Sequence, residues 1–158
     1  MTRKKPWNRI DAPVYSVSSF NETKNNMNIC TYVTAISMHP KRFVVGIYKN
    51  TCTLTNVMMH PKFILQLLSF NQYRLVNLLG KSSGTSIDKI TKLKAPLMMW
   101  NEFHVLQEAC ALIHLSVIEW IDAGDHWATI CEVIAYKNMN DTLPLTLNDL
   151  RLKKIIRG

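Results

Sequence analysis

Short apolar runs, separated by polar turns, recur along most of this chain. Many of these runs are rich in β-branched and aromatic residues, which favour strands because their side chains suit a pleated surface. The pattern predicts strands over residues 14–18, 28–38, 42–48, 63–69, 110–121 and 127–137, with a closing edge at 145–147. The two long strands near the C-terminus are predicted to form a hairpin, because Gly124-Asp125 is a turn signal between them.

Helix signals interrupt these strands in several places. Short helices are predicted over residues 51–59 and 71–79, and another begins near Ser86. Asn50 or Thr51 can cap the first helix, and Gly80 supplies a left-handed stop for the second. Because the strands do not alternate with long helices, the fold class is predicted to be mainly β, a small β-barrel with short helical insertions.

The length of 158 residues and the hydrophobic content of 47% suit one domain with a sizeable core. Residues 1–12 are expected to be a basic N-terminal arm, residues 13–150 the folded domain and residues 151–158 a basic C-terminal tail. No apolar run approaches the roughly 18 residues that a membrane helix needs. The basic N-terminus also lacks the apolar core of a secretion signal. A cytoplasmic protein that does not enter a membrane is therefore expected.

The formal net charge of +8 raises the question of nucleic-acid binding. The basic residues are scattered over both ends and a middle group, Lys81 to Lys94, and form no motif with aromatic residues. Nucleic-acid binding through the basic ends is therefore the weakest alternative, and the middle group suits a phosphorylated small molecule better. The four cysteines lack the close spacing of zinc or thioredoxin-like motifs and are expected to be buried free thiols.

Three separated segments place hydrogen-bond donors at the start of a helix or the end of a strand. Lys49 to Thr53 enters the first helix, where free N–H groups and the helix dipole attract an anion. Lys81 to Lys89 is a second loop that feeds a helix. Gly124-Asp125-His126 is a turn with a titratable ring at the mouth of the hairpin. Each segment alone has a structural explanation, since Thr caps are common and turns favour polar residues such as His126.

The order of these segments resembles the flavin reductase-like, FMN-binding split-barrel family, and most of all its flavoredoxin-type branch. In that family an Asn opens a strand, and a Pro-containing turn and a second apolar strand follow. A basic residue and a Thr then begin a helix, and a Phe begins the next strand. The matching positions are Asn28, His39-Pro40, residues 42–48, Lys49, Thr53 and Phe63, then Ser83-Gly84, Asp88-Lys89, Gly124-Asp125-His126 and Leu143-Pro144. The resemblance covers roughly residues 12–150 and implies a split β-barrel with an FMN-binding domain over residues 13–150.

The resemblance implies an FMN site built from distant stretches of the chain. Asn28 and the strand up to Thr34 would border the isoalloxazine ring, and Thr53, Lys49 and the first helix would hold the phosphate. The predicted cofactor-binding residues are Asn28, Thr31, Tyr32, Val33, Thr34, Lys49, Asn50, Thr51, Thr53, Ser83, Lys89 and His126, and no metal ligands are expected.

Two of these residues would act on the ring itself. Lys89 would face the flavin and offset negative charge at its N1 atom. His126 would be a donor and a proton source near the ring, and is the residue assigned a catalytic role. One departure concerns Thr34, which stands where this branch often carries a large aromatic residue, commonly Trp. Tyr32, two positions away, lies on the same face, so altered ring stacking is expected.

The implied activity is that of an oxidoreductase in which NADH or NADPH passes a hydride to bound FMN. The FMN would then reduce free flavin, another acceptor or a partner protein. The alternative is a module that holds FMN for electron transfer or sensing and has no nicotinamide activity. Hydrolysis is not supported, since no Ser or Cys nucleophile is paired with His126 by a known spacing. Split barrels of this family usually pair, so a homodimer with flavin near the subunit boundary is expected.

Overall fold

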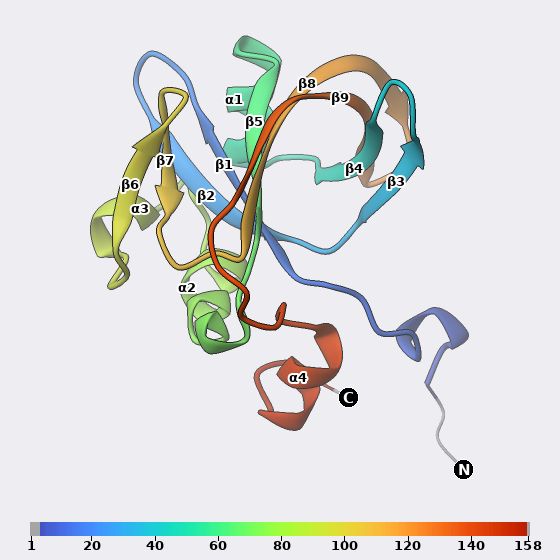
Figure 1. The fold of residues 1–158 in the computed structure, drawn as a ribbon, viewed down its shortest axis with the longest axis vertical. Helices are drawn as coiled ribbons and strands as arrows, with labels where there is room; N and C mark the ends of the chain where they lie inside the picture. The colour runs from blue at the N-terminus through green and yellow to red at the C-terminus, as the bar shows by residue number, and fades with distance from the viewer. Residues whose placement is uncertain (1–3, 158) are drawn as a thin grey trace.

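The computed structural model describes residues 4–157, so residues 1–3 of the predicted arm and residue 158 of the predicted tail lie outside the described part. The strands are β1 (Tyr15–Phe20), β2 (Asn25–Cys30), β3 (Val33–Ser37), β4 (Arg42–Tyr48), β5 (Lys62–Leu67), β6 (Leu97–Trp100), β7 (Phe103–Leu106), β8 (Ala111–Asp122) and β9 (His126–Asn138). They form a seven-stranded sheet in the order β2-β1-β5-β8-β9-β4-β3 and a separate β6-β7 pair, as Figure 1 shows. All pairings are antiparallel. The predicted mainly β fold is confirmed.

The connection between β2 and β3 shows that the large sheet curls into a barrel. These strands are its two edges, which in a flat sheet of this order would be about 29 Å apart at roughly 4.8 Å between neighbours. Only Thr31 and Tyr32 join them, and the three peptide units between Cys30 and Val33 span at most about 11 Å. The edges therefore meet here, where the Gly46 amide of β4 donates a 2.8 Å hydrogen bond to the Tyr32 carbonyl. This is the predicted split β-barrel.

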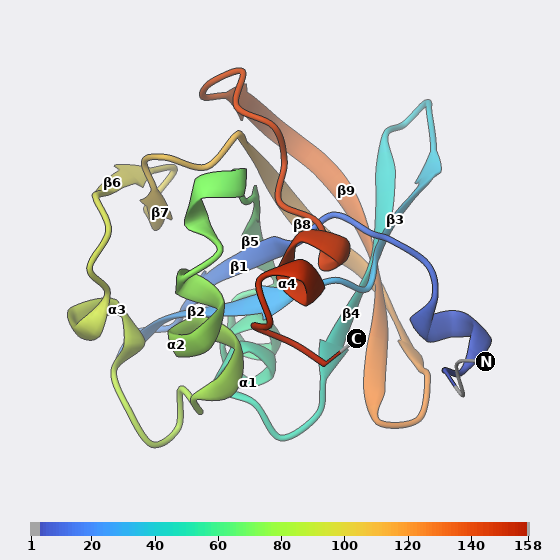
Figure 2. The same ribbon diagram turned by 90° about the horizontal axis from the view of Figure 1, so that it is seen from below.

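Short helices are inserted between the strands. They are α1 (Cys52–Met59), α2 (Leu75–Lys81), α3 (Lys89–Lys92) and α4 (Leu147–Leu152), with 3-10 turns η1 (Pro6–Asn8) and η2 (Phe70–Gln72). α1 packs against β1 and β2, whereas α2 and α3 pack against β2. Figure 2 shows these three helices around β2, with the β3–β4 hairpin projecting on the opposite side. Each helix within residues 4–157 is too short or too polar to cross a lipid bilayer.

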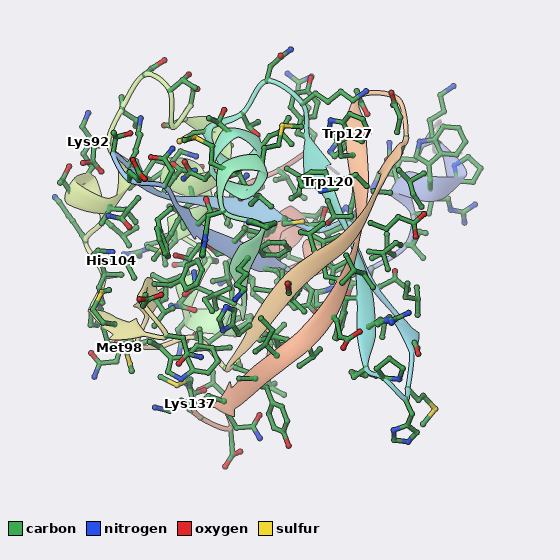
Figure 3. All side chains as sticks on the ribbon, turned by 90° about the horizontal axis from the view of Figure 1, so that it is seen from above. Lys92, Met98, His104, Trp120, Trp127 and Lys137 are labelled. Atoms are coloured by element: carbon green, nitrogen blue, oxygen red, sulfur yellow. The ribbon has the colours of Figure 1, made fainter. Side chains whose placement is uncertain are left out.

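The apolar side chains form two buried clusters. One fills the barrel between β1, β4, β5, β8 and β9, and includes Val17, Val45, Phe63, Leu115 and Cys131. The other lies beneath α2, α4 and the β6–β7 pair, and includes Ile64, Leu79, Phe103, Leu112 and Leu150. Trp120, which packs against the first cluster, lies next to Trp127 near the end of the β8–β9 hairpin (Figure 3), with ring centroids 6.1 Å apart.

The sequence pattern was wrong about the strand predicted over residues 28–38. The chain forms two strands there, β2 and β3, because it crosses from one edge of the sheet to the other at Thr31 and Tyr32. β2 also begins three residues earlier than predicted, at Asn25. Residue propensity alone does not mark this crossing, since Thr31 and Tyr32 both favour strands.

Two further boundaries differ from the prediction. α2 continues through Gly80 to Lys81, so Gly80 is not a left-handed stop. Its missing side chain instead allows close packing, because a Cβ there would lie 3.2 Å from Cγ1 of Ile29. The edge predicted at 145–147 is an isolated bridge that leads into α4, whose first turn is capped by the Thr146 hydroxyl. Beyond α4, residues 155 and 156 of the segment predicted as a tail pack against the core.

Candidate functional site

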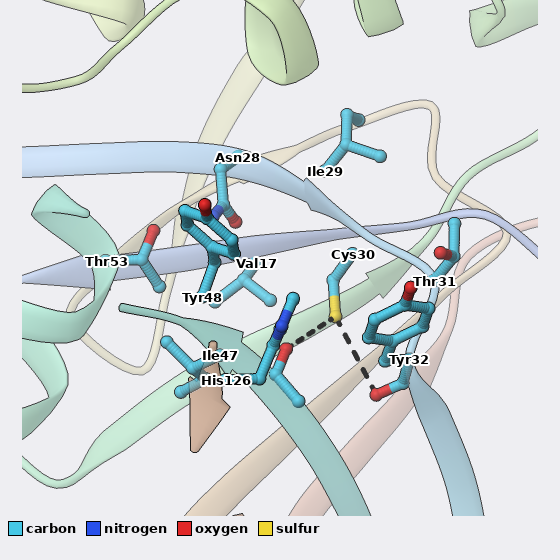
Figure 4. Close-up of a pocket in the computed structure, with 11 residues that line it drawn as sticks. Val17, Asn28, Ile29, Cys30, Thr31, Tyr32, Ile47, Tyr48, Thr53 and His126 are labelled. Atoms are coloured by element: carbon cyan, nitrogen blue, oxygen red, sulfur yellow. Dashed lines mark hydrogen bonds between the residues drawn. The ribbon is translucent and has the colours of Figure 1, made fainter. Parts of the chain in front are cut away.

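Three hollows adjoin one another along the meeting edges of the barrel. The central hollow, ≈ 190 Å³, is lined by the ends of β2 and β4 and by His126, as Figure 4 shows. The polar hollow, ≈ 380 Å³, lies between β2, the start of α1, the end of α2 and Lys89. The outer hollow, ≈ 530 Å³, lies beside β3 and β4 and has small residues such as Thr34 and Ala128 in its wall.

Neighbouring hollows share wall residues, so they lie side by side. The central and polar hollows share Asn28, Ile29, Tyr48 and Thr53. The central and outer hollows share Thr31, Tyr32, Gly46 and His126. His126 therefore lies where the outer and central hollows meet, and Asn28 lies where the central and polar hollows meet.

Aromatic rings surround the central hollow. The His126 ring lies between Tyr32 and Tyr48, with centroid distances of 4.9 Å and 5.0 Å. Tyr32 is 66% exposed and Tyr48 is 51% exposed, so both offer ring surface to a ligand. Gly46 makes this arrangement possible, because a Cβ there would lie 2.9 Å from Cβ of Tyr32. These faces suit a flat aromatic ligand.

His126 is oriented by its neighbour in the turn. Its Nδ1 lies 2.7 Å from Oδ1 of Asp125. This hydrogen bond is the main cause of the lowered pKa of Asp125, whose carboxyl is therefore ionised at neutral pH. A carboxylate can only accept, so Nδ1 carries a hydrogen and Nε2 is the nitrogen that can exchange a proton. Strand pairing of Tyr48 with His126 sets the ring at the mouth of the central hollow.

The start of α1 forms one wall of the polar hollow. The Thr51 hydroxyl caps the helix by accepting a hydrogen bond from the amide of Leu54, at 3.2 Å. Thr53 is buried, and its hydroxyl oxygen accepts a 3.2 Å hydrogen bond from Nδ2 of Asn26. The first N–H groups of a helix point outward and carry partial positive charge. This wall therefore favours an anionic group.

A buried cation lies on the opposite wall. Lys89 is only 3% exposed, and its Nζ donates a 2.7 Å hydrogen bond to the Leu79 carbonyl at the end of α2. Burial lowers the pKa of Lys89 to about 8. Lys24 lies nearby, with its Nζ donating to the Gly84 carbonyl, and its positive charge also lowers that pKa. An anion in this hollow would stabilise the charged form of Lys89.

The structure brings together most of the residues predicted from the sequence. Thr31, Tyr32 and His126 line the central and outer hollows, whereas Val33 and Thr34 line only the outer one. Asn50, Thr51, Ser83 and Lys89 line the polar hollow, and Asn28 and Thr53 line both the polar and the central hollow. Lys89 thus lies in the same hollow as the start of α1 and Ser83, and does not line the hollow that contains His126.

Lys49 is the predicted residue that the structure does not bring to the others. Its Nζ donates a 2.8 Å hydrogen bond to Asp122 at the end of β8 and lies 4.9 Å from the Trp127 ring centroid. The pairing keeps the pKa of Asp122 below its usual range. The lysine therefore ties the end of β4 to the β8–β9 hairpin and lies outside the walls of the three hollows.

Sequence reasoning missed several wall residues, including Asn26, Gly46, Tyr48 and Cys52. A signal for Asn26 was present, since alternate residues of a strand share a face and Asn26 precedes Asn28 by two positions. Tyr48 is the last residue of β4, shortly before the start of α1, and this position could also be recognised from the sequence. The cysteines were predicted correctly as buried free thiols, and burial raises the pKa of Cys30 to about 12.

Comparison with known proteins identifies the class to which this fold and cavity belong. The model of the flavin reductase like domain matches residues 7–155. The chain therefore belongs to the flavin reductase-like family, as its motifs predict. No curated protein matches the chain significantly.

Solved structures share the fold at low sequence identity. An FMN-binding protein from Thermus thermophilus is 24% identical with a TM-score of 0.77, over 88% of this chain and 78% of that one. An NADH:FAD oxidoreductase, SgcE6, from Streptomyces globisporus is 14% identical with a TM-score of 0.80, over 89% and 83%. A flavoredoxin from Methanosarcina acetivorans is 17% identical with a TM-score of 0.74, over 87% and 76%.

Proposed function

We propose that the chain binds FMN and catalyses hydride transfer from NADH or NADPH to this flavin. The observation that carries the proposal is the change of chemistry along this row of adjoining hollows. Aromatic rings surround its central part, and hydroxyls, helix N–H groups and a buried lysine surround its polar end. FMN has the same sequence of parts, a flat ring joined by a chain to a phosphate.

The residues of the polar hollow fit a phosphate monoester. Ser83 and the first N–H groups of α1 are donors, and Lys89 is a cation within the wall. The Thr51 hydroxyl donates its own hydrogen to the Tyr48 carbonyl, so Thr51 acts through its cap of α1. Charge-assisted hydrogen bonds of this kind are stronger than neutral ones. In this proposal, Lys89 therefore contacts the phosphate and not the flavin ring. Lys49 is not part of the phosphate site.

The ring would lie in the central hollow against Tyr32, Tyr48 and His126. When bound, FMN supplies the capacity to accept a hydride. The chain's own part is to orient the ring and exclude water from one side of it. His126, held through Nδ1 by Asp125, can hold or release a proton at Nε2. The outer hollow, open beside Thr34, leaves room for the nicotinamide donor.

Binding and activity can be tested separately with the purified full chain. Titration with FMN, followed by calorimetry, should give one site per chain. Mixing the FMN-loaded protein with NADH or NADPH in a stopped-flow instrument should bleach the flavin absorption band. Bleaching by dithionite alone would favour the alternative, an FMN-holding electron-transfer or sensing module. Absence of FMN binding would overturn both.

We also propose that the chain forms a homodimer and passes electrons to free flavin or an acceptor protein. The outer faces of β8 and β9 expose apolar side chains, including Ile118, Ile134 and Tyr136. Contiguous exposed apolar surface often marks an interface. Light scattering should give twice the 18.2 kDa mass of one chain, and a mass of one chain would contradict the dimer.

A further inference from the structure

Two asparagines of β2 point into the middle of the cavity. Asn26 and Asn28 are two residues apart on one strand, so they share a face and their Cα atoms lie about 7 Å apart. Both line the polar hollow, and Asn28 also lines the central hollow. In Figure 4, Asn28 and Tyr48 overlap in the view, with Thr53 on one side of them and His126 and Tyr32 on the other. The two side chains therefore stand where the aromatic part of the cavity changes into the anion-binding part.

The side-chain oxygens of these asparagines are buried acceptors. Within residues 4–157, neither Oδ1 of Asn26 nor Oδ1 of Asn28 accepts a hydrogen bond. Asn26 is 2% exposed, and its Nδ2 donates to the Thr53 hydroxyl at 3.2 Å. Gly84 leaves room beside the Asn26 oxygen, which a Cβ at that position would overlap. We call the two oxygens the acceptor pair.

A buried acceptor is costly unless something donates a hydrogen bond to it. A ligand that fills this part of the cavity must therefore present donors to the acceptor pair. A phosphate at neutral pH offers mainly acceptor oxygens, so it suits the donors around Lys89 instead. The carbon-bound hydrogens of a plain alkyl chain would leave both oxygens without a partner. Hydroxyl groups along a chain meet the requirement, because one hydroxyl has one hydrogen to donate and the acceptor pair needs two.

We propose that the acceptor pair recognises the hydroxyl groups of a polyol chain that joins the aromatic ring of the ligand to its phosphate. The proposal rests on FMN binding, and it adds a selection step in the middle of the molecule. A site built to hydrogen-bond a hydroxyl rejects an analogue without it, because the buried polar groups of the protein then remain unpaired. The acceptor pair would thus select flavins with a hydroxylated chain against flavins with a plain one.

The test compares FMN with an analogue whose phosphorylated five-carbon chain carries no hydroxyls. Both ligands are titrated into the full chain and into Asn28→Leu, which has a side chain of similar size without an acceptor. The matched control is Asn25→Leu, since Asn25 is an exposed neighbour on the same strand. Thermal unfolding of each variant checks that the fold is kept.

The wild-type chain should bind FMN at least about tenfold more tightly than the analogue, because an unpaired buried acceptor carries a cost of that order. Asn28→Leu should lose most of this preference by weakening FMN binding, and Asn25→Leu should keep it. Equal or tighter binding of the analogue by the wild-type chain would overturn the proposal while leaving flavin binding intact. A preference that persists in Asn28→Leu would also overturn the role of this residue. If neither ligand bound, FMN binding itself would have failed.

Discussion

The two ends of the cavity differ in how their side chains are held. At the polar end, Lys89 is buried and bonded to the Leu79 carbonyl, and Asn26 is bonded to Thr53. At the aromatic end, Tyr32 and Tyr48 are more than half exposed and touch His126 through their rings. A group that is held before binding loses little freedom on binding. The polar end should therefore determine affinity, and the exposed rings should determine how the bound ring is placed.

The largest effect on FMN affinity is expected from Lys89→Met, which removes the buried cation of the polar end. FMN affinity should fall roughly a hundredfold, because a charge-assisted hydrogen bond is lost. Riboflavin, which has no phosphate, should bind almost as before. Fluorescence titration of both flavins gives the comparison, with Lys92→Met as the control because Lys92 is exposed on the same helix. Equal losses for FMN and riboflavin would show that Lys89 does not act on the phosphate.

Raising the pH should weaken binding of the phosphate at the polar end and leave binding of the flavin ring unchanged. Lys89 has its pKa lowered to about 8 by burial, so in the free chain it is charged below that pH and neutral above it. FMN affinity should therefore be constant from pH 7 to about 8 and then fall, approaching tenfold per pH unit. Riboflavin affinity should stay level over the same range. Calorimetry at several pH values measures both, and a level profile for FMN would contradict the role of Lys89.

The burial of Lys89 also predicts how the stability of the fold changes with pH. The charged form of Lys89 is disfavoured in the fold, relative to its ordinary pKa of 10.5. The destabilisation is complete below pH 8 and decreases as the pH rises toward 10.5, because the unfolded chain then holds more protons. Lys89→Met should thus unfold at a temperature no lower than the wild type at pH 7. Thermal unfolding of the two proteins checks this.

The aromatic end can be strengthened by Thr34→Trp, which restores the large ring often found in the flavoredoxin-type branch. Thr34 is exposed in the wall of the outer hollow, so the new ring has space. Affinity for FMN and riboflavin should rise together by about fivefold, as an added aromatic contact would provide. Fluorescence quenching measures both changes. A gain restricted to FMN would contradict the assignment of this end to the ring.

His126→Asn should have the smallest effect on affinity, within about threefold, because it removes one ring contact among several. The rate of flavin reduction by NADH should fall about a hundredfold, if proton transfer at Nε2 assists the reaction as general acids and bases do. Stopped-flow absorbance separates the rate from binding. A large loss of FMN affinity with an unchanged reduction rate would show that His126 acts in binding and not in proton transfer.

The sequence predicted the fold class and most of the cavity wall, because strand propensity, helix caps and the motif order are local signals. It did not predict that the barrel edges meet at Thr31 and Tyr32, since nothing local distinguishes a crossing from a continuous strand. The sequence predicts Lys49 at the phosphate because it precedes the first helix. In the structure its ammonium group instead donates a hydrogen bond to Asp122, which is distant in sequence. Lys89 was predicted to face the flavin ring, but folding brings it beside α2 in the polar hollow.

A crystal structure of the complex with FMN tests the single shared cavity most directly. The phosphate is expected between the start of α1 and Lys89, with the flavin ring beside His126 and the chain that joins them passing Asn26 and Asn28. A phosphate bound outside the polar hollow, or a ring placed away from the central hollow, would contradict the account.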